Sequence, residues 1–409
     1  MAHILLGVTG SIAAYKAPFL VRALQKRGHE VTVVLTRGAK AFVSPLVLEV
    51  LTRRPVLEDM WSVKSTGERA DKWIQHIALA TQVDAILIAP ITAHTIAKLA
   101  RGLCDDLLSA VFLATRKPVL IAPAMEENMY FHPAVQANIR LLQKRSGVFI
   151  IPPGKGFLAS GGIGKGRLAA PTRILWAVER ALSPPLLKGK RILITAGATR
   201  ESWDSVRFLS NGSTGRMALA LAEAAYALGA EEIHILAAHL EVRFPKGILR
   251  ITPALAAEDM MKSFQQIYER YDWILFTAAV SDYKFAEKFE GKRKKAKESV
   301  HIELVPTADI LAWAGAHKKP SQVLIGFALE NEGEIHYAQE KVFKKKADWI
   351  AFNPISANTG MSVSTNSITL LSRWGHQYNI PLASKAVIAK KMLIFIADAM
   401  AGRVPNTSS

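Results

Sequence analysis

Short apolar runs alternate with segments of helical periodicity from one end of the chain to the other. In the first half the runs are HILLGVTGS (3–11), EVTVVLT (30–36), VDAILIAP (83–90), KPVLIAPA (117–124) and VFIIPP (148–153). An apolar run of this length between helical segments is typical of a buried strand. The alternation therefore predicts a parallel sheet with helices on both faces.

The second half repeats this pattern. Its apolar runs are RILITAGATR (191–200), EIHILAAH (232–239), DWILFTAAV (272–280), QVLIGFALE (322–330), DWIAFN (348–353) and SITLLSR (367–373). We therefore expect an α/β protein made of two doubly wound, Rossmann-like domains.

The segment SPPLLKGK (183–190) separates the two halves. It contains paired prolines and follows PTRILWAVERAL (171–182), which has helical periodicity. A chain of 409 residues exceeds what one hydrophobic core usually serves, so two domains of about 200 residues each are expected. The predicted domains are residues 1–186 and 187–409.

Composition narrows the class of protein. The only cysteine, Cys104, excludes an internal disulfide and a cysteine-rich metal site, and this suits a reducing compartment such as the cytoplasm. Cys104 stands in LARGLCDDLL, where we expect a helix and a small buried apolar side chain. Near the N-terminus, Gly7, Thr9 and Gly10 interrupt the first apolar run, so neither a membrane span nor a targeting segment is predicted.

The formal net charge is +18. A basic surface attracts polyanions and small phosphorylated substrates, and it also keeps a protein soluble, so charge alone does not decide between these roles. Basic residues are not interleaved with aromatic residues, and no nucleic-acid-binding motif is present. We therefore expect no nucleic-acid partner.

Ligands of open parallel sheets bind beyond the carboxyl ends of the strands. After the first run, GVTGSIAAYK places Gly10 in a turn that permits close backbone approach, and Ser11 where it caps a helix whose N-terminus accepts phosphate. An ordinary strand-to-helix connection explains the same turn. The spacing G-x-G-x-x-G is missing, so the turn is not a dinucleotide-binding fingerprint.

Other polar segments follow the later runs. ITAHTIAKLARG and MEENMYFHPAVQ place hydroxyl, amide and carboxylate groups at the same edge, although helix capping would explain either alone. The glycine-rich LASGGIGKGRLAAP does not fit a P-loop, and we predict a mobile flap with Arg167 as an anion clamp. In the second half, Gly212 and Gly215 lead into a helix suited to a phosphate or carboxylate, and Lys292–Lys295 and Lys344–Lys346 form basic clusters.

Together these motifs resemble, in order and over nearly the whole chain, the bacterial family of bifunctional phosphopantothenoylcysteine decarboxylase/phosphopantothenate-cysteine ligases. The first half carries GVTGSIAAYK, TRGAKAFVSPL, HIALA, AP-x-TA, PAM-x-x-x-MY and the GxGR flap. The second half carries TAGATRE, VRFLSN, GRM, AAVSDY, KRKK, ADIL and GFALE. The resemblance implies an enzyme of coenzyme A biosynthesis.

For the first domain the resemblance implies a flavoprotein of the cysteine decarboxylase type, with FMN between the subunits of a trimer. The flavin oxidises the substrate thiol, carbon dioxide leaves, and the enethiol is then reduced. His76 corresponds to the family's active-site histidine, and Met129 and Arg167 to its substrate-binding positions. The FMN-binding positions are Gly10, Ser11, Ile12, Thr36, Thr92, Ala93, His94 and Thr95.

Two catalytic positions depart from the family pattern. Glu126 replaces an asparagine that grips the substrate carboxylate, and Ser160 replaces a cysteine that donates a proton. A serine hydroxyl is a far weaker acid than a thiol. In one hypothesis the decarboxylase is active and Glu126, kept protonated by burial, is the acid; in the other this domain is an impaired FMN-binding scaffold for an active ligase.

For the second domain the resemblance implies a CTP-dependent ligase. The carboxylate of 4'-phosphopantothenate attacks CTP, and cysteine then displaces CMP to give phosphopantothenoylcysteine. Asn211 serves the acyl-cytidylate step, and Mg²⁺ accompanies CTP, without assigned metal ligands. The CTP-binding positions are Asp282, Lys292, Ala308, Asp309, Ile310, Leu311, Phe327, Lys341 and Lys345. Ala198, Thr214, Arg216 and Ala308 are mild departures from the family pattern.

The resemblance also implies the assembly, in which trimers of the first domain are joined through dimers of the second. Cysteine-peptide decarboxylases and flavin prenyltransferases share the first fold, but neither class explains residues 191–400. A degenerate flavoprotein that acts only by association is a further alternative, which a turnover assay tests.

Overall fold

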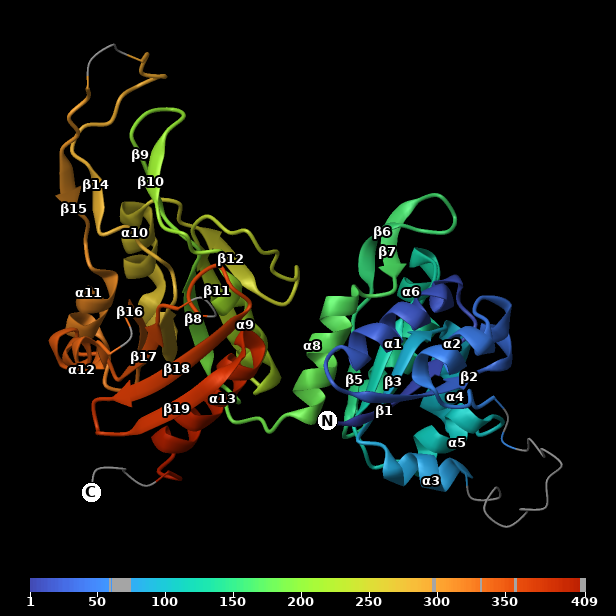
Figure 1. Cartoon of the computed structure of the whole chain (residues 1–409). Coiled ribbons are helices and arrows are strands. Elements are labelled where there is room, and N and C mark those ends of the chain that lie inside the picture. Colours follow the sequence, from blue (N-terminus) through green and yellow to red (C-terminus); the bar gives the residue numbers. More distant parts are fainter. Residues whose placement is uncertain (59, 61–74, 296–298, 332, 357–358, 405–409) are drawn as a thin grey trace. The chain divides into compact units, whose positions relative to one another are not determined.

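The computed structural model describes residues 1–58, 60, 75–295, 299–331, 333–356 and 359–404 (Figure 1). The chain divides into two compact units, Met1–Ser183 and Pro184–Ser409. Among the residues described, no helix is both long enough and apolar enough to cross a lipid bilayer.

The first unit contains a sheet of five parallel strands in the order β2-β1-β3-β4-β5. Its strands are β1 (His3–Val8), β2 (Glu30–Leu35), β3 (Ala85–Ile91), β4 (Val119–Pro123) and β5 (Val148–Ile150). All five were predicted. The order reverses between β1 and β3, so this edge is the expected ligand site.

Helices cover both faces of this sheet, as predicted (Figure 1). Along β1, the side chains of Ile4 and Leu6 belong to one buried cluster and that of Leu5 to another, because successive strand residues point to opposite faces. The helical segments are η1 (Ile12–Lys16), α1 (Ala17–Gln25), η2 (Arg37–Ala41), α2 (Pro45–Thr52), α3 (Gln75–Gln82), α4 (Ala93–Arg101), α5 (Leu107–Ala114), α6 (Glu127–Phe131), α7 (Pro133–Gln143) and α8 (Pro171–Leu182).

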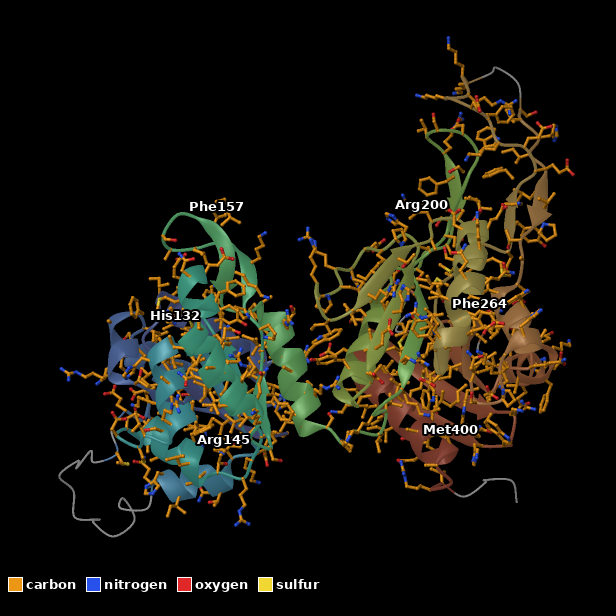
Figure 2. The ribbon with its side chains drawn as sticks, turned by 180° about the vertical axis from the view of Figure 1, so that it is seen from behind. His132, Arg145, Phe157, Arg200, Phe264 and Met400 are labelled. Atoms are coloured by element: carbon orange, nitrogen blue, oxygen red, sulfur yellow. The ribbon has the colours of Figure 1, made fainter. Side chains whose placement is uncertain are left out.

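The glycine-rich flap forms an antiparallel hairpin of β6 (Gly154–Phe157) and β7 (Ile163–Arg167). Gly166 lies so close to the chain after β4 that a Cβ atom there would stand 2.1 Å from the carbonyl oxygen of Met125. Phe157 projects from the hairpin and is 70 % exposed (Figure 2). Glycine is thus required at position 166 for the close contact between hairpin and sheet edge.

The second unit contains an eight-stranded mixed sheet. In spatial order its strands are β12 (Arg250–Pro253), β11 (Glu232–Ala237), β8 (Arg191–Ala196), β13 (Trp273–Phe276), β16 (Val323–Glu330), β17 (Trp349–Pro354), β18 (Thr365–Ser372) and β19 (Gln377–Ser384). The first six are parallel. In chain order they lie 3-2-1-4-5-6, which is a doubly wound Rossmann arrangement; that fold class was predicted, but the strand β12 was not.

The edge formed by β18 and β19 differs from a purely parallel sheet. The strand predicted at 367–373 runs antiparallel to β17, and β19, which we did not predict, pairs antiparallel with it. The turn between β18 and β19 contains Gly375 with a positive φ of 86°. A short turn of this kind joins antiparallel strands only, because a parallel pair needs a long crossover.

Helices α9 (Arg216–Ala227), α10 (Ala257–Ile267), α11 (Ile310–His317), α12 (Ile335–Lys344) and α13 (Lys385–Met400) pack on this sheet, and η4 (Tyr268–Arg270) follows α10. Phe264 of α10 is fully buried among aromatic side chains (Figure 2). Two small antiparallel ribbons that we did not predict extend from the sheet (Figure 1): β9 (Arg200–Ser202) with β10 (Phe208–Ser210), and β14 (Tyr283–Phe285) with β15 (Leu304–Pro306).

Candidate active sites

The first unit has a cavity of about 330 Å³ at the carboxyl ends of β1 and β4. Four of the residues that we predicted for this domain line it: Ser11, Ile12, Glu126 and Arg167. The remaining wall comes from η1, the segment before α6 and the flap hairpin: Ala13, Tyr15, Lys16, Ala124, Met125, Phe157, Leu158, Ala159, Gly166 and Leu168.

Ser11 connects two strand ends at this cavity. Its hydroxyl donates a hydrogen bond to the carbonyl oxygen of Ala124 at 3.1 Å and accepts one from the backbone N–H of Ala13 at 3.4 Å. Ser11 therefore caps η1, as predicted, and ties the loop after β1 to the loop after β4.

Gly10 lies against a second loop. A Cβ atom at this position would stand 2.9 Å from the carbonyl carbon of Gly38, which belongs to the short helix η2 in the loop that joins β2 to α2. The sequence suggested that Gly10 lets a ligand approach the backbone, and in the structure the close neighbour is this loop. Gly10 is thus required for loop packing whether or not a ligand is bound.

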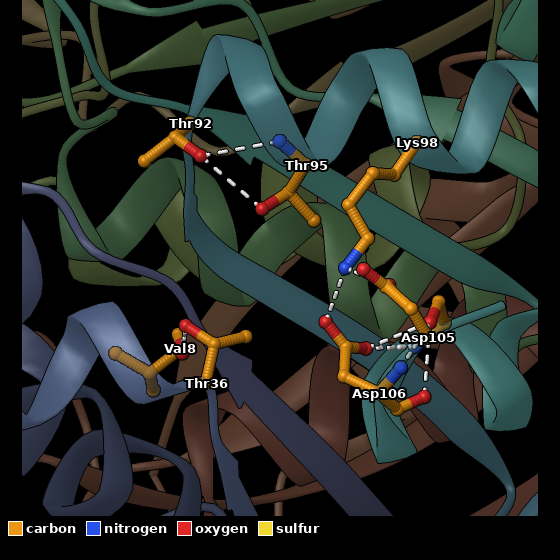
Figure 3. A network of polar contacts seen from close by, with 8 residues as sticks. Val8, Thr36, Thr92, Thr95, Lys98, Asp105 and Asp106 are labelled. Atoms are coloured by element: carbon orange, nitrogen blue, oxygen red, sulfur yellow. Dashed lines mark hydrogen bonds and ion pairs between the residues drawn. The ribbon is translucent and has the colours of Figure 1, made fainter. Parts of the chain in front are cut away.

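The other predicted FMN residues follow the same sheet edge but lie outside the cavity of the single chain. Thr92 caps α4 by accepting from the Thr95 N–H at 3.3 Å, and its own N–H donates to the Thr9 hydroxyl at 2.9 Å. Thr36 donates to the carbonyl oxygen of Val8 at 3.3 Å (Figure 3). Ala93 and the exposed His94 form the first turn of α4, beside Thr95.

In the last turn of α4, Lys98 forms ion pairs with Asp105 and Asp106 (Figure 3). Burial alone would lower the pKa of Lys98, but its bonds to the two carboxylates raise it above its usual value. Burial would likewise raise the pKa of Asp106, yet Lys98 and the Ser109 N–H hold it low. The Lys98–Asp106 pair therefore stays ionised and fixes the start of α5, which Asp106 caps.

Cys104 corrects one of our predictions. It is exposed, and it lies in the loop between α4 and α5, not inside a helix. The continuous helix is broken because Gly102 ends α4 with a φ of 75° and Asp106 caps α5.

His76 and Met129 do not line the cavity of the single chain. His76 is half-buried near the start of α3. Met129 lies in the short helix α6 and is 50 % exposed.

The two departures from the family pattern contact each other. Ser160, in the turn of the flap hairpin, donates a hydrogen bond from its hydroxyl to Oε2 of Glu126 at 2.9 Å. Glu126 is half-buried and Ser160 is exposed. The full burial that we expected to keep Glu126 protonated is therefore not observed in the single chain.

Two neighbouring contacts fasten the flap to the same segment. The Lys165 N–H donates to Oε1 of Glu127 at 2.6 Å, and the Met125 N–H donates to the carbonyl oxygen of Gly166 at 3.0 Å. These hydrogen bonds hold the flap against the segment that carries Glu126.

The second unit has a cavity of about 420 Å³. It lies between the segment that joins β10 to α9 and the loop that follows β13, at the point where the strand order reverses. Its lining includes nearly all of the residues that we predicted for this domain: Asn211, Asp282, Ala308, Asp309, Ile310, Leu311, Phe327, Lys341 and Lys345.

The predicted lysines of this cavity have acidic partners. Lys345 forms an ion pair of 2.8 Å with Asp309, and Lys341 forms one with Glu330. Asp309 also caps α11 by accepting from the Ala312 N–H at 2.9 Å. Burial would raise the pKa of Asp309, but the hydrogen bonds from Lys345 and from the backbone N–H outweigh burial and lower the pKa below its usual value. The carboxylate is therefore ionised. These pairs hold the two cations at the cavity wall.

Asn211 lies directly after β10. Its Nδ2 group donates to the carbonyl oxygens of Ala279 and Val280, both at 3.4 Å. The side chain therefore links the glycine-containing segment before α9 to the loop after β13, across the point where the strand order reverses.

The structure adds Lys385 to this cavity. Its Nζ is buried and donates to the carbonyl oxygens of Gly360 at 2.9 Å and Met361 at 3.1 Å. Burial, and then the nearby Arg216, lower its pKa to about 8. The sequence contained one signal for this residue. A positive charge in the first turn of a helix interacts unfavourably with the helix dipole, so a lysine directly after the N-cap Ser384 of α13 indicates a role other than helix stabilisation.

Lys292 is the predicted CTP residue that does not line the cavity. It is exposed, between Gly291 and Arg293 in the segment that follows β14. Nor do the described parts of the chain contain a group of three or more His, Cys, Asp or Glu side chains able to hold a metal ion.

Comparison with known proteins identifies a family for each unit. Residues 1–183 match the family described as flavoprotein. Residues 187–400 match the family described as the DNA/pantothenate metabolism flavoprotein C-terminal domain.

Relatives match over both units. The coenzyme A biosynthesis bifunctional protein CoaBC of Bacillus subtilis is 40 % identical over 399 residues, which are 97 % of this chain and 96 % of that protein. A cysteine/cysteine sulfinic acid decarboxylase from an unknown prokaryotic organism is 37 % identical over 86 % of this chain and 98 % of its own length. A crystal structure of the C-terminal domain of a CoaBC protein is 34 % identical, with a TM-score of 0.45, and covers 53 % of this chain and 99 % of that domain.

Proposed function

The chain belongs to the family of coenzyme A biosynthesis bifunctional proteins, and on that premise we propose its substrates and the order of its reactions. It is an enzyme with ligase and decarboxylase activities. The second unit joins cysteine to 4'-phosphopantothenate with CTP. The first unit decarboxylates the product, phosphopantothenoylcysteine, to 4'-phosphopantetheine, and we place both reactions in the cytoplasm.

One observation carries the ligase assignment: residues predicted for CTP binding, from four separate segments, line a single cavity at the switch point of a Rossmann sheet. The carboxylate of 4'-phosphopantothenate attacks the α-phosphorus of CTP and pyrophosphate leaves. The amine of cysteine then attacks the acyl carbon and CMP leaves. Both steps move negative charge among phosphate oxygens, which Lys341 and Lys345 stabilise, while Asn211 orients the acyl-cytidylate.

We expect Mg²⁺ to enter as its complex with CTP. Magnesium commonly keeps several waters and binds through substrate phosphates and one or two carboxylates. Asp282 is a carboxylate at the cavity wall, but we do not assign it as a metal ligand.

We propose FMN as the cofactor of the first unit. The capped starts of η1 and α4 present backbone N–H groups at one sheet edge, beside a cavity lined by Ile12 and Arg167, and this combination suits a phosphate-bearing aromatic ligand. When bound, FMN supplies two-electron oxidation of the thiol and the later return of the electrons. Arg167 binds the anionic substrate, Glu126 donates the proton to the enethiol carbon, and Ser160 orients the Glu126 carboxyl group.

We also propose that FMN lies between subunits, in trimers of the first unit that dimers of the second unit join. Several predicted FMN residues lie outside the cavity of one chain. Large apolar side chains of η1 and α1 are open to solvent: Ile12 and Tyr15, which line that cavity, are 55 % and 53 % exposed, and Phe19 is 66 % exposed. Exposed apolar patches of this kind mark interaction surfaces.

The decisive experiment supplies the protein with 4'-phosphopantothenate, cysteine and CTP, and measures pyrophosphate and carbon dioxide separately. Release of both supports the two proposed activities. Pyrophosphate alone, even after FMN is added, would favour a scaffold role for the first unit. Carbon dioxide from cysteine without 4'-phosphopantothenate would favour a cysteine decarboxylase, the activity named for one relative.

A further inference from the structure

Asp204 is a buried carboxylate outside both cavities. It lies in the turn between β9 and β10, and its side chain is 0 % exposed. Oδ1 accepts from the backbone N–H groups of Val206 at 2.8 Å and Arg207 at 2.7 Å. Oδ2 accepts from Nε of Arg207 at 2.9 Å. The Arg207 guanidinium, followed by these N–H groups, holds the pKa of Asp204 far below its usual range, so the group is an anion.

The same carboxylate binds a second segment. Oδ2 of Asp204 also accepts from the backbone N–H of Arg293 at 3.2 Å, and the Arg207 guanidinium donates to the carbonyl oxygen of Arg293 at 2.6 Å. Residue 293 is thus fixed through both of its backbone polar groups. Asp204 and Arg207 are 89 and 86 residues away from it in the sequence.

Further contacts join the 203–207 turn to the 289–293 segment. The Phe289 N–H donates to the carbonyl oxygen of Trp203 at 2.9 Å, and the Ser205 N–H donates to that of Gly291 at 3.2 Å. The guanidinium groups of Arg207 and Arg293 lie 4.4 and 5.3 Å from the ring centre of Trp203. We call these contacts the Asp204 clamp.

Lys292 stands between the two clamped residues, Gly291 and Arg293. Its side chain is exposed, and within the described chain it has no hydrogen bond or ion pair. The backbone on both sides of Lys292 is therefore held, while its ammonium group is available for a ligand.

Both ribbons that meet at the clamp also reach the ligase cavity. Asn211 follows β10 directly, Asp282 directly precedes β14, and both residues line the cavity. The strands β9 and β14 lie side by side. The clamp thus joins two arms that each connect to the cavity wall at their other end.

We propose that Asp204 is a positioning residue of the ligase reaction: by clamping the backbone on both sides of Lys292, it holds that ammonium group for the phosphates of the nucleotide. This inference rests on the proposed function and on the prediction, made from the family resemblance, that Lys292 binds CTP. A freely moving lysine would lose side-chain and backbone entropy on each binding event, and a clamped backbone has already lost part of it.

The test is a double-mutant cycle of Asp204→Asn and Lys292→Ala, with pyrophosphate release from CTP and 4'-phosphopantothenate as the assay. Asparagine keeps the shape but removes the charge that binds Arg207 and the Arg293 N–H. We expect each single variant to lower kcat/KM for CTP by about 10- to 100-fold, and the double variant to fall little below the single variants. Asp398→Asn is the matched control, because it removes a partly exposed carboxylate paired with Arg403 in the same unit.

A second readout does not depend on activity. The segment 288–295 contains Lys288, Lys292, Arg293, Lys294 and Lys295, all sites for trypsin. We expect Asp204→Asn to be cleaved within 288–295 several-fold faster than the parent, and Asp398→Asn at the parent rate, because cleavage requires local opening of the backbone. Mass spectrometry of the tryptic fragments identifies the sites of cleavage.

The outcomes distinguish the CTP-binding role of Lys292 from the positioning role of Asp204. If Lys292→Ala leaves pyrophosphate release unchanged, the CTP role of Lys292 fails and the inference falls with it. If Lys292→Ala slows the reaction while Asp204→Asn does not, or if their effects multiply independently, only the clamp is overturned.

Should Asp204→Asn not fold, Arg293→Ala replaces it, since it removes the guanidinium from Trp203 and leaves the backbone. A smaller loss that is again coupled to Lys292→Ala supports the clamp, and independent effects overturn it.

Discussion

The two units place a candidate site at the same point of similar sheets, yet they gather their residues differently. In the second unit one chain brings all of the predicted residues except Lys292 to one cavity. In the first unit only Ser11, Ile12, Glu126 and Arg167 line the cavity, and the other predicted residues lie along the sheet edge, on α3 and α6, or in the flap turn. A doubly wound sheet therefore specifies where a site lies, but not whether one chain completes it.

The electrostatics of the two cavities differ as well. The cavity of the second unit contains lysines that ion pairs with carboxylates hold in place, together with the buried Lys385. At the first cavity the notable polar contact joins a carboxyl group to a hydroxyl on the flap. The lysines of the second unit's cavity suit stabilisation of phosphate charge. The carboxyl–hydroxyl contact of the first unit's cavity suits transfer of a proton.

The strongest test of this division is Asn211→Asp. An aspartate cannot donate to the carbonyl oxygens of Ala279 and Val280 and adds negative charge beside an anionic intermediate. We expect overall ligation to fall by about 100-fold or more. Acyl-cytidylate should still form, and its onward use should be blocked. Quenched-flow analysis of the intermediate measures this, and decarboxylation of supplied phosphopantothenoylcysteine should be unchanged. A parallel loss of decarboxylation would contradict the independence of the two sites.

Glu126→Gln is the corresponding test of the first unit. Glutamine preserves shape but has no acidic proton, so formation of 4'-phosphopantetheine should fall by about 100-fold or more while FMN binding and release of carbon dioxide continue. Chromatography should detect the oxidised enethiol. The matched control is Glu127→Gln, the neighbouring glutamate that binds the flap backbone instead of Ser160. Normal product from Glu126→Gln would remove this residue as the proton donor.

Ser160→Ala examines the same pair from the flap side. It removes one hydrogen bond to Glu126 and no acidic group, so a loss of about 3- to 10-fold is expected in 4'-phosphopantetheine formation. A loss as large as that of Glu126→Gln would make Ser160 itself the essential group. Stopped-flow measurement of flavin reoxidation locates the affected step.

Phe19→Glu probes why the first site is incomplete in one chain. Phe19 is 66 % exposed on α1, and a charge there would disfavour an apolar subunit contact. We expect weaker assembly in sedimentation and about tenfold weaker FMN binding by absorbance titration, with the ligase rate unchanged. Full FMN affinity in a dissociated protein would show that one chain completes the flavin site.

Lys385 offers a test through protein stability instead of activity. Its pKa of about 8 in the folded protein lies below its ordinary value of 10.5. Between these values the unfolded chain binds the proton and the folded chain does not, so the unfolding free energy should rise with pH from about 8 to 10.5, by at most about 1.4 kcal/mol per pH unit. Lys385→Met should lack this rise in urea unfolding. Equal pH dependence in the two proteins would contradict the lowered pKa.

The sequence alone determined much of this protein. Buried parallel strands read as continuous apolar runs, and so every strand of the first sheet was predictable from local pattern. The motifs that carry the family resemblance also lie within single loops, which made Asn211, Asp309 and Lys345 predictable as site residues although their spatial neighbours were unknown.

Only the tertiary structure decided the contacts between distant segments. The hydrogen bond from Ser160 to Glu126 spans 34 residues, and that from the Arg293 N–H to Asp204 spans 89. The break at Gly102, the antiparallel edge at β19 and the burial of Lys385 also escaped prediction. A pattern of apolar residues records which face of an element is buried, but a polar side chain acquires its partner, its exposure and its charge state from whatever segment the fold places against it.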